Sequence, residues 1–192
     1  MVKSKCPCFA RSELFQPGDV ITEDCNECVC KNSAFVCTEK DCGGTCKLVG
    51  NGHITTFDNT QYTLGAMNSE CDYTLLQKDD LQIVLHRDAN FQNAVLLRWN
   101  NSQEILEVNR QLEVRYHYRK VLNFPYSGTE FTVNKSPFAA EIIFQNTTTI
   151  SFDADSIYIH EATAEDSRVA GLCGTFTRMQ VDDFKTPSVT EA

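Results

Sequence analysis

Cysteines are the residues of this chain whose number and spacing point most directly to chemistry. The 192 residues contain ten of them, and eight lie in the first 46 positions. These eight are Cys6, Cys8, Cys25, Cys28, Cys30, Cys37, Cys42 and Cys46, and the other two are Cys71 and Cys173. So short a segment cannot bury enough apolar surface to fold unaided, and we expect covalent cross-links to hold it. Because disulfides persist in oxidising compartments, the sequence predicts a secreted, extracellular protein.

Zinc is the competing interpretation of four of these cysteines. Cys25, Cys28, Cys37 and Cys42 could supply four thiolates in a tetrahedral arrangement. A zinc site would leave the remaining cysteines of the segment without a role, and an oxidising compartment favours disulfides. We therefore predict disulfides, although spacing alone does not determine which cysteines pair.

Other residues of the chain offer little catalytic chemistry. The four histidines, His53, His86, His117 and His160, are scattered, and three fall on predicted strands at polar-facing positions. No nucleophile elbow, zinc-protease motif or phosphate-binding glycine loop occurs, which predicts a protein that is not an enzyme. The net charge of −9 argues against nucleic-acid or anionic-membrane partners. No apolar run is long enough for membrane insertion.

Two further features concern processing of the chain. Sequons make Asn100, Asn134 and Asn146 candidate glycosylation sites, although Pro137 directly after the second sequon disfavours Asn134. Residues 1–5 carry two lysines and no apolar stretch, which is not the pattern of a signal peptide. A secreted chain of this kind is expected to be a piece of a larger precursor.

The first 46 residues are dominated by turns. Turn-forming residues recur every few positions there and leave room for two or three strands of at most about five residues. The apolar side chains expected to cover the disulfides are Phe15, Val20, Ile21, Val29, Phe35 and Val36. We therefore predict a small disulfide-stapled module at 1–46.

From residue 47 onward, β-branched and aromatic residues alternate with polar ones, most regularly between Leu112 and Arg119, as in strands with one buried face. Further strands are predicted at 73–76, 81–86, 95–99, 105–108, 131–133, 140–144, 149–152 and 157–160. Only 161–168 could form a helical turn. The predicted fold class is mainly β, with an antiparallel β-sandwich-like domain at 47–192 after the small module.

Three groups of motifs resemble one known arrangement of domains. The first group lies at 6–8, 17–18, 25–30 and 35–38, with Cys42 and Cys46. The second comprises His53, Thr56-Phe57-Asp58, Tyr62 and Cys71-Asp72-Tyr73-Thr74-Leu75, and the third Gly171-Leu172-Cys173-Gly174-Thr175-Phe176 and Asp182-Asp183-Phe184. They resemble an E-type (VWC- or TIL-like) cysteine-rich module followed by a von Willebrand factor type D domain, as in von Willebrand factor, gel-forming mucins and related secreted glycoproteins.

The resemblance implies a disulfide framework. It pairs Cys46 with Cys173 and suggests Cys8 with Cys30, whereas the pairing of the other four cysteines of the small module stays open. Cys6 and Cys71 are left over: they could be free because their partners lie outside this chain, bond to each other, or cross-link chains into oligomers. Ala170 replaces the first cysteine of the family's Cys-Gly-Leu-Cys motif, so no redox-active pair can form there.

The resemblance also implies a calcium ion, which prefers six to eight oxygen ligands. Asp58, Asp182 and Asp183 are the retained candidate ligands. Thr175, Thr177, Arg178 and Val181 stand where the family more often has Asn, Asp, Gly and Asn, and Arg178 adds positive charge. The alternative is that the three aspartates only cap turns.

Function follows from the resemblance as a choice between three classes. The first is a non-catalytic structural, assembly and interaction module of a larger secreted mucin-like, clotting-type or extracellular-matrix glycoprotein, with its partners among that protein's other domains or other extracellular proteins. The second is a growth-factor-binding modulator of the crossveinless type, and the third an enzyme fragment, because some luciferases contain type D domains. Growth-factor capture needs an apolar patch on the small module, but a solvated surface is predicted at Lys3, Lys5, Arg11, Glu13, Glu23, Glu27 and Lys31, which favours assembly.

Overall fold

The computed structural model describes residues 6–10, 12–23, 25–40, 42–50, 52–65, 71–87, 93–153, 155–162 and 169–183. The chain divides into two compact units, Met1–Cys42 and Gly43–Ala192. Cys46 lies in the second unit, on its strand β6 (Gly44–Val49). The two units are described separately below.

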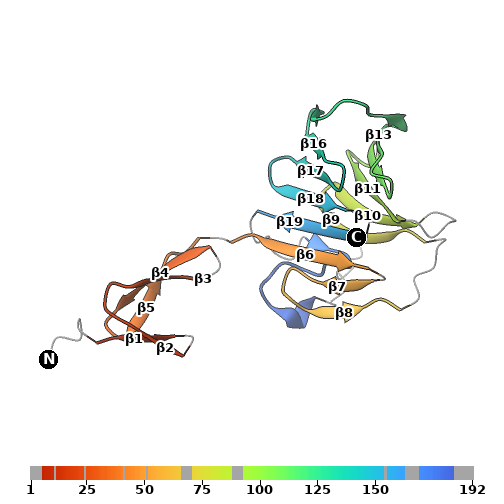
Figure 1. The fold of residues 1–192 in the computed structure, drawn as a ribbon. Helices are drawn as coiled ribbons and strands as arrows, with labels where there is room; N and C mark the ends of the chain where they lie inside the picture. The colour runs from red at the N-terminus through yellow and green to blue at the C-terminus, as the bar shows by residue number, and fades with distance from the viewer. Residues whose placement is uncertain are drawn as a thin grey trace. The chain divides into compact units, whose positions relative to one another are not determined.

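Five short strands build the first unit (Figure 1). A hairpin of β1 (Cys8–Ala10) and β2 (Glu13–Phe15) accompanies a three-stranded antiparallel sheet of β3 (Val20–Glu23), β4 (Asn26–Lys31) and β5 (Ala34–Cys37). Asn32 and Ser33 both have positive φ, 54° and 69°, as a two-residue hairpin turn requires. The strands outnumber the predicted two or three, and β4 has six residues instead of at most five.

The buried interior of this unit consists mainly of cysteines. Cys8, Cys28, Cys30 and Cys42 are buried together with Ile21, and the rings of Phe15 and Phe35 meet edge to face at 5.5 Å. The prediction that Val20 and Val36 cover the disulfides is wrong, because they are 57% and 52% exposed. Both align with Val29 across the sheet, whereas Cys28 and Cys30 are on the opposite face of β4, since successive side chains alternate.

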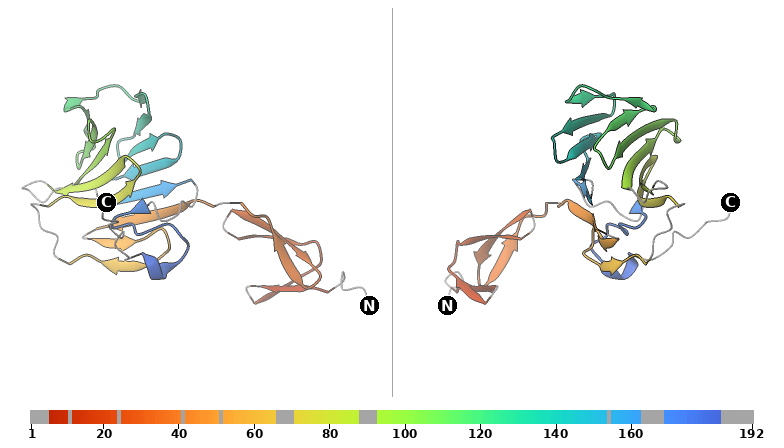
Figure 2. Two further views of the ribbon diagram at one scale, coloured as in Figure 1. Left: turned by 180° about the vertical axis from the view of Figure 1, so that it is seen from behind. Right: turned by 45° about the vertical axis from the view of Figure 1, so that its right-hand side comes forward.

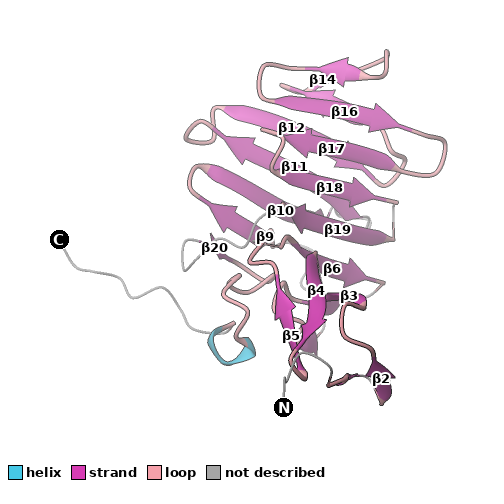
Figure 3. Cartoon of the chain, turned by 90° about the vertical axis from the view of Figure 1, so that its left-hand side faces the viewer, coloured by secondary structure: helices cyan, strands magenta, loops and turns pink. Residues whose placement is uncertain are grey.

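The second unit is a sandwich of two antiparallel sheets, which Figures 2 and 3 show as two layers. One sheet has the order β14-β13-β12-β11-β10-β9-β20, and the other β15-β16-β17-β18-β19-β6-β7-β8. The strands of the first are β9 (Tyr73–Lys78), β10 (Leu81–Arg87), β11 (Asn93–Trp99), β12 (Glu104–Asn109), β13 (Val114–Tyr116), β14 (Arg119–Lys120) and β20 (Val169–Ala170). Besides β6, the second contains β7 (His53–Thr55), β8 (Gln61–Thr63), β15 (Tyr126–Ser127), β16 (Phe131–Lys135), β17 (Ala140–Phe144), β18 (Thr148–Phe152) and β19 (Ser156–Glu161). The predicted mainly β, antiparallel fold class is confirmed.

Alternating burial along the strands forms the core between the sheets. In β17 the buried residues are Ala140, Ile142 and Phe144, and in β18 they are Thr148, Ile150 and Phe152. Trp99 is an aromatic centre of this core: its ring meets those of Phe131 and Phe144 edge to face, each at 5.4 Å. Burial of this apolar surface is the main force that stabilises the unit.

One polar contact crosses the core. Lys78 Nζ on β9 lies 2.8 Å from Glu161 Oε2 on β19, and the side chains are only 10% and 1% exposed. Thr148 Oγ1 donates to the other carboxylate oxygen of Glu161 at 2.7 Å. Because β9 and β19 belong to different sheets, this buried ion pair connects the two layers.

Two predicted elements differ from the structure. The alternating segment from Leu112 to Arg119 is not one strand, because His117 and Tyr118 adopt φ of 47° and 62° and turn the chain between β13 and β14. The hydrophobic pattern continues through this turn, so the sequence does not indicate that the strand is interrupted. Of the proposed helical turn, Glu161 ends β19, and 163–168 lie outside the described residues.

The described helical structure is one short 3₁₀ helix, Gln180–Asp182. No described helix has the length and apolar character needed to cross a bilayer.

Candidate cation loop and disulfide framework

Three disulfides cross-link the first unit: Cys8–Cys30, Cys25–Cys42 and Cys28–Cys37. The first is the pair that the resemblance suggests, and the other two settle, in this structure, a connectivity that spacing left open. Glu23, Cys28 and Cys37 do bring three potential metal-ligand atoms within 4.8 Å of one another. Both cysteines are oxidised, however, and a disulfide offers no thiolate to zinc.

The second unit has one disulfide, Cys46–Cys173, which joins β6 to the turn after β20 across a sequence separation of 127. Its Cα atoms are 5.5 Å apart, an ordinary separation, and both cysteines are buried. The backbone of Cys173 also donates to Leu75 O at 2.9 Å, and Phe57 N donates to Cys173 O at 3.2 Å. The segment after β20 is therefore attached both to β9 and to the loop after β7.

Cys6 and Cys71 form no disulfide in the structure, and both are exposed. Beside Cys71, Asp72 contacts His86 Nδ1 at 2.6 Å and Arg98 at 2.9 Å. Partial burial would raise the pKa of Asp72, but the hydrogen bonds from His86 and Arg98 and their charges lower it below its usual value.

Two loops bring the predicted calcium ligands into one region. Asp58 lies between β7 and β8, whereas Asp182 and Asp183 follow Cys173 by nine and ten positions. Phe57 and Phe176 stack with their centroids 5.2 Å apart and hold the loops together. Asp58 and Asp183 are buried and Asp182 is partly buried. Phe184, the last residue of the motif, lies outside the described residues.

Hydroxyl groups and backbone amides surround two of these carboxylates. Asp58 accepts hydrogen bonds from the backbone of Thr177 at 3.1 Å and of Arg178 at 2.7 Å. The Thr177 hydroxyl lies 3.3 Å from Asp58 Oδ2 and 2.8 and 2.9 Å from the two oxygens of Asp182, and Thr175 Oγ1 donates to Asp182 at 2.9 Å. One hydroxyl carries one proton, so Thr177 cannot satisfy three carboxylate oxygens at once.

The third carboxylate is only half satisfied. Thr56 Oγ1 donates to Asp183 Oδ2 at 2.8 Å, but Asp183 Oδ1 is buried without a hydrogen-bond partner among the described residues. Thr60 Oγ1, in the loop between β7 and β8, is likewise buried with no partner among the described residues. A methyl group on Gly174, which has φ 73°, would lie 2.1 Å from Asp183 Oδ1, so any other residue there would strain the backbone and displace Asp183.

The donor set fits a hard cation in its chemistry: it is rich in oxygen and contains one buried carboxylate oxygen, Asp183 Oδ1, with no hydrogen-bond partner among the described residues. The three aspartates do not form a group whose ligand atoms all lie within 4.8 Å of one another. Thr177 contacts both Asp58 and Asp182, whereas Asp183 accepts its hydrogen bond from Thr56. Arg178 is exposed and has a φ of 66°, a backbone conformation that glycine adopts at little cost.

Sequence reasoning did not assign ligand roles to the threonines. In the sequence, Thr175 and Thr177 stand out only as departures from the family pattern, yet their hydroxyls are within hydrogen-bond distance of the carboxylates. Thr56, which bonds to Asp183, stands out only as part of a motif. The alternation of threonine at 175 and 177 before two aspartates was the available signal, because hydroxyls are oxygen ligands too.

The candidate glycosylation sites fall in two kinds of position. Asn100 and Asn146 are exposed in turns with φ of 53° and 57°, where a glycan would project into solvent. Asn134 lies on β16, is partly buried, and donates its side-chain amide to Glu141 at 3.1 Å. Its own hydrogen bond, together with Pro137, disfavours modification.

Comparison with known proteins is consistent with these motifs. Residues 46–190 match the family model described as von Willebrand factor type D domain. Human otogelin-like protein is 31% identical over 200 residues, covering 95% of this chain and 8% of that protein. Human Mucin-2 is 30% identical over 200 residues (96% of this chain, 4% of that protein), and rat SCO-spondin 28% identical over 197 residues (95% and 4%). The chain thus spans less than a tenth of the length of these relatives.

Proposed function

Because this chain belongs to the von Willebrand factor type D domain family, we propose that it is a non-catalytic structural and assembly module of a larger secreted, mucin-like or matrix glycoprotein. The observation that carries the proposal is the combination of a sandwich closed by Cys46–Cys173 with two exposed thiols, Cys6 and Cys71. Its partners would be other domains of the same glycoprotein or other extracellular proteins. We propose that the first unit is the E-type module.

The proposed assembly role requires that the exposed thiols form cross-links. Under oxidising conditions the chain should yield disulfide-linked dimers on non-reducing gels, with a Cys71 or Cys6 peptide in the cross-link by mass spectrometry. Cys71→Ser and Cys6→Ser test each thiol, and neither should change folding because both are exposed. A chain that stays monomeric with both thiols freely alkylated would contradict cross-linking through this segment.

We also propose that the loop around Asp58 and Asp182 holds calcium. Asp58, Asp182 and the hydroxyls of Thr175 and Thr177 would hold the ion, and the bound ion would neutralise the carboxylates and stabilise both loops. Saturating calcium at about 100 times its Kd should raise the unfolding free energy by about 2.7 kcal/mol. Thr177→Val removes an oxygen ligand at nearly constant volume and should weaken the response.

Thr147→Val is the matched control, because Thr147 is an exposed threonine in the β17–β18 turn, remote in the chain from the aspartates. Magnesium serves as a second control, because it demands a stricter octahedral geometry than calcium. An unchanged melting temperature with calcium and with chelator would contradict calcium binding, and the aspartates would then only cap turns.

A second candidate function is growth-factor capture by the first unit, and one observation favours it. Val20 and Val36 expose an apolar row across the sheet, and Phe9 and Leu14, paired on the β1–β2 hairpin, are 69% and 67% exposed. The solvated surface predicted at Glu13, Glu23, Glu27 and Lys31 is present as exposed residues, whereas Lys3, Lys5 and Arg11 lie outside the described residues. Surface plasmon resonance against secreted growth factors, with Val20→Ser/Val36→Ser as the variant, tests this candidate; no binding by the parent chain rejects it.

A further inference from the structure

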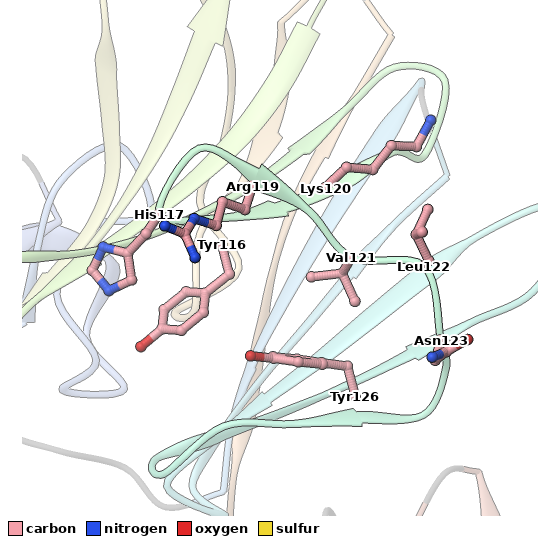
Figure 4. A pocket seen from close by; sticks show the side chains of 8 residues that line it. All are labelled: Tyr116, His117, Arg119, Lys120, Val121, Leu122, Asn123 and Tyr126. Atoms are coloured by element: carbon pink, nitrogen blue, oxygen red, sulfur yellow. The ribbon is translucent and has the colours of Figure 1, made fainter.

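A cavity of about 710 Å³ opens at one end of the sandwich (Figure 4). There β14 is the outermost strand of one sheet and β15 the outermost strand of the other, and residues 121–125 connect them. The volume falls within the range of roughly 300–1,000 Å³ that is typical of small-molecule sites. All of its lining residues belong to the second unit, and none of them is in the loops that carry Asp58, Asp182 and Asp183.

The aromatic wall of the cavity is held rigidly. Tyr116 donates its hydroxyl to Glu104 Oε2 at 2.6 Å, and His117 Nε2 lies 2.6 Å from the same oxygen. The Tyr116 and Tyr126 rings each pack against Phe131, with centroid distances of 5.1 and 5.9 Å. The hydrogen bond to Glu104, and secondarily burial, raise the pKa of Tyr116 to about 12, so its hydroxyl stays a donor at neutral pH. Such a wall needs no rearrangement to receive a ligand.

Three of the other polar side chains that line the cavity have no partner among the described residues. Among the described residues, the side chains of Arg119, Asn123 and Tyr126 make no hydrogen bond or ion pair, whereas Lys120 contacts Glu113. Figure 4 shows the Arg119 guanidinium beside the Tyr116 ring, and the Tyr126 hydroxyl directed toward the Tyr116 side chain. No acidic residue is among the lining side chains, although the chain carries a net charge of −9. The cavity therefore offers one unpaired cation, two aromatic faces and neutral hydrogen-bonding groups.

We propose that this cavity binds an anionic sugar, with Arg119 recognising its carboxylate or sulfate and the tyrosines lying against its ring. A guanidinium presents paired N–H donors that match a carboxylate or sulfate in geometry. The Tyr126 hydroxyl and the Asn123 amide can bond to sugar hydroxyls, which an apolar acid would leave without partners. An acidic peptide is the less suitable occupant, because β14 and β15 have only two residues each and offer little edge for strand addition.

Titration of the whole 192-residue chain tests the proposal, with binding followed by ligand-observed NMR. The probes are the methyl glycoside of N-acetylneuraminic acid, which carries a carboxylate, and galactose 6-sulfate, which carries a sulfate; methyl galactoside is the neutral control. Binding is expected for one or both anionic sugars and not for the neutral one. Arg119→Ala should weaken it at least about tenfold, because a charge-assisted bidentate contact is lost.

Two variants separate recognition from folding. Arg110→Ala removes an exposed arginine that instead pairs with Asp155 at 3.2 Å, and it should bind as the parent chain does. Tyr126→Phe keeps the ring and removes the unused hydroxyl, so it should weaken binding less than Arg119→Ala. Equal binding of the neutral sugar, equal loss in Arg110→Ala, or no binding of either anionic sugar would overturn the proposal. Binding of an acidic peptide alone would assign the cavity to that class instead.

Discussion

The two units of this chain achieve order by different means. The first has three disulfides and a buried interior of four cysteines and Ile21, whereas the second has one disulfide and a continuous apolar core between two sheets. The strands of the first unit are too few and short to enclose a core, so covalent links take its place. Of the two units, the one that buries less apolar area has more disulfides.

The same contrast applies to exposed apolar side chains. The first unit exposes Phe9 and Leu14 on its β1–β2 hairpin and Val20 and Val36 on its three-stranded sheet, because neither small sheet is covered on both faces. In the second unit each sheet covers the inner face of the other, and most of the exposed large apolar residues lie outside the strands, such as Tyr118 and Phe138; Val49 at the end of β6 is also exposed. The small sheets of the first unit therefore keep an apolar surface that the two-layer sandwich buries.

Reduction of the disulfides should unfold the first unit but not the second, and this is the largest difference that we expect between them. A graded increase of reductant should unfold the first unit, because each lost disulfide removes about 2–5 kcal/mol, while the second unit retains its core. Amide NMR signals of Ile21 and Val29 report on the first unit, and fluorescence of Trp99, the only tryptophan, reports on the second. Simultaneous loss of both signals at one reductant concentration would show that the two units depend equally on their disulfides.

Within the second unit, Lys78→Met should lower the free energy of unfolding by about 3–5 kcal/mol, because it leaves the Glu161 charge buried without its partner. Urea denaturation followed by Trp99 fluorescence measures the change. Lys78→Met/Glu161→Leu should recover most of the loss, since neither buried charge remains. Arg110→Ala, which removes an exposed pair with Asp155, should cost less than about 1 kcal/mol. Equal effects of Lys78→Met and Arg110→Ala would show that the contact between the sheets does not stabilise them.

Gly174→Ala should lower the unfolding free energy by about 1–3 kcal/mol, through its left-handed backbone and the contact with Asp183. Gly50→Ala is the matched control, because Gly50 has φ 58° but no atom within 4 Å of an added methyl group. The difference between the two variants isolates the steric term. A smaller loss for Gly174→Ala than for Gly50→Ala would mean that Asp183 moves away freely.

Tyr62→Phe should have the smallest effect, about 1 kcal/mol at neutral pH, from loss of the hydrogen bond to Leu172 O. Burial, and then the nearby charge of Asp183, raise the pKa of Tyr62 from 10 to about 12. A raised pKa means that the folded state holds this proton more tightly, so its stabilisation is complete below pH 10 and is lost as pH rises to 12. Stability measured across this window should fall less steeply in Tyr62→Phe than in the parent chain; Tyr116, whose pKa is also raised to about 12, contributes to the slope in both. An identical slope would contradict the raised pKa of Tyr62.

Much of the fold could be predicted from local patterns. The segments 81–86, 95–99 and 140–144 are strands, because alternation of apolar and polar residues is a direct consequence of strand geometry. The turn at His117 and Tyr118 could not be predicted, since positive φ is uncommon for residues other than glycine and the alternation continues through the turn. The exposure of Val20 and Val36 could not be predicted either. Alternation of apolar and polar residues identifies the apolar face of a strand, but it does not show whether another layer covers that face.

The candidate sites show the same limit. Asp58, Asp182 and Asp183 could be named from motifs, but the role of Thr177 depends on how loops 119 positions apart approach each other. Nor does any local signal near Arg119 indicate a cavity. Its lining comes from the outermost strands of two different sheets, whose approach depends on the packing of the whole sandwich.

Strand periodicity, turn residues and cysteine spacing act over a few neighbouring positions, so they are enough to predict a mainly β, extracellular, disulfide-dependent chain in two parts. They do not predict the register of the two sheets, the burial of Lys78 against Glu161, the cluster of oxygens around Asp58 and Asp182, or the cavity beside Arg119. Each of these depends on contacts between distant segments, whose geometry is set by the packing of the whole core.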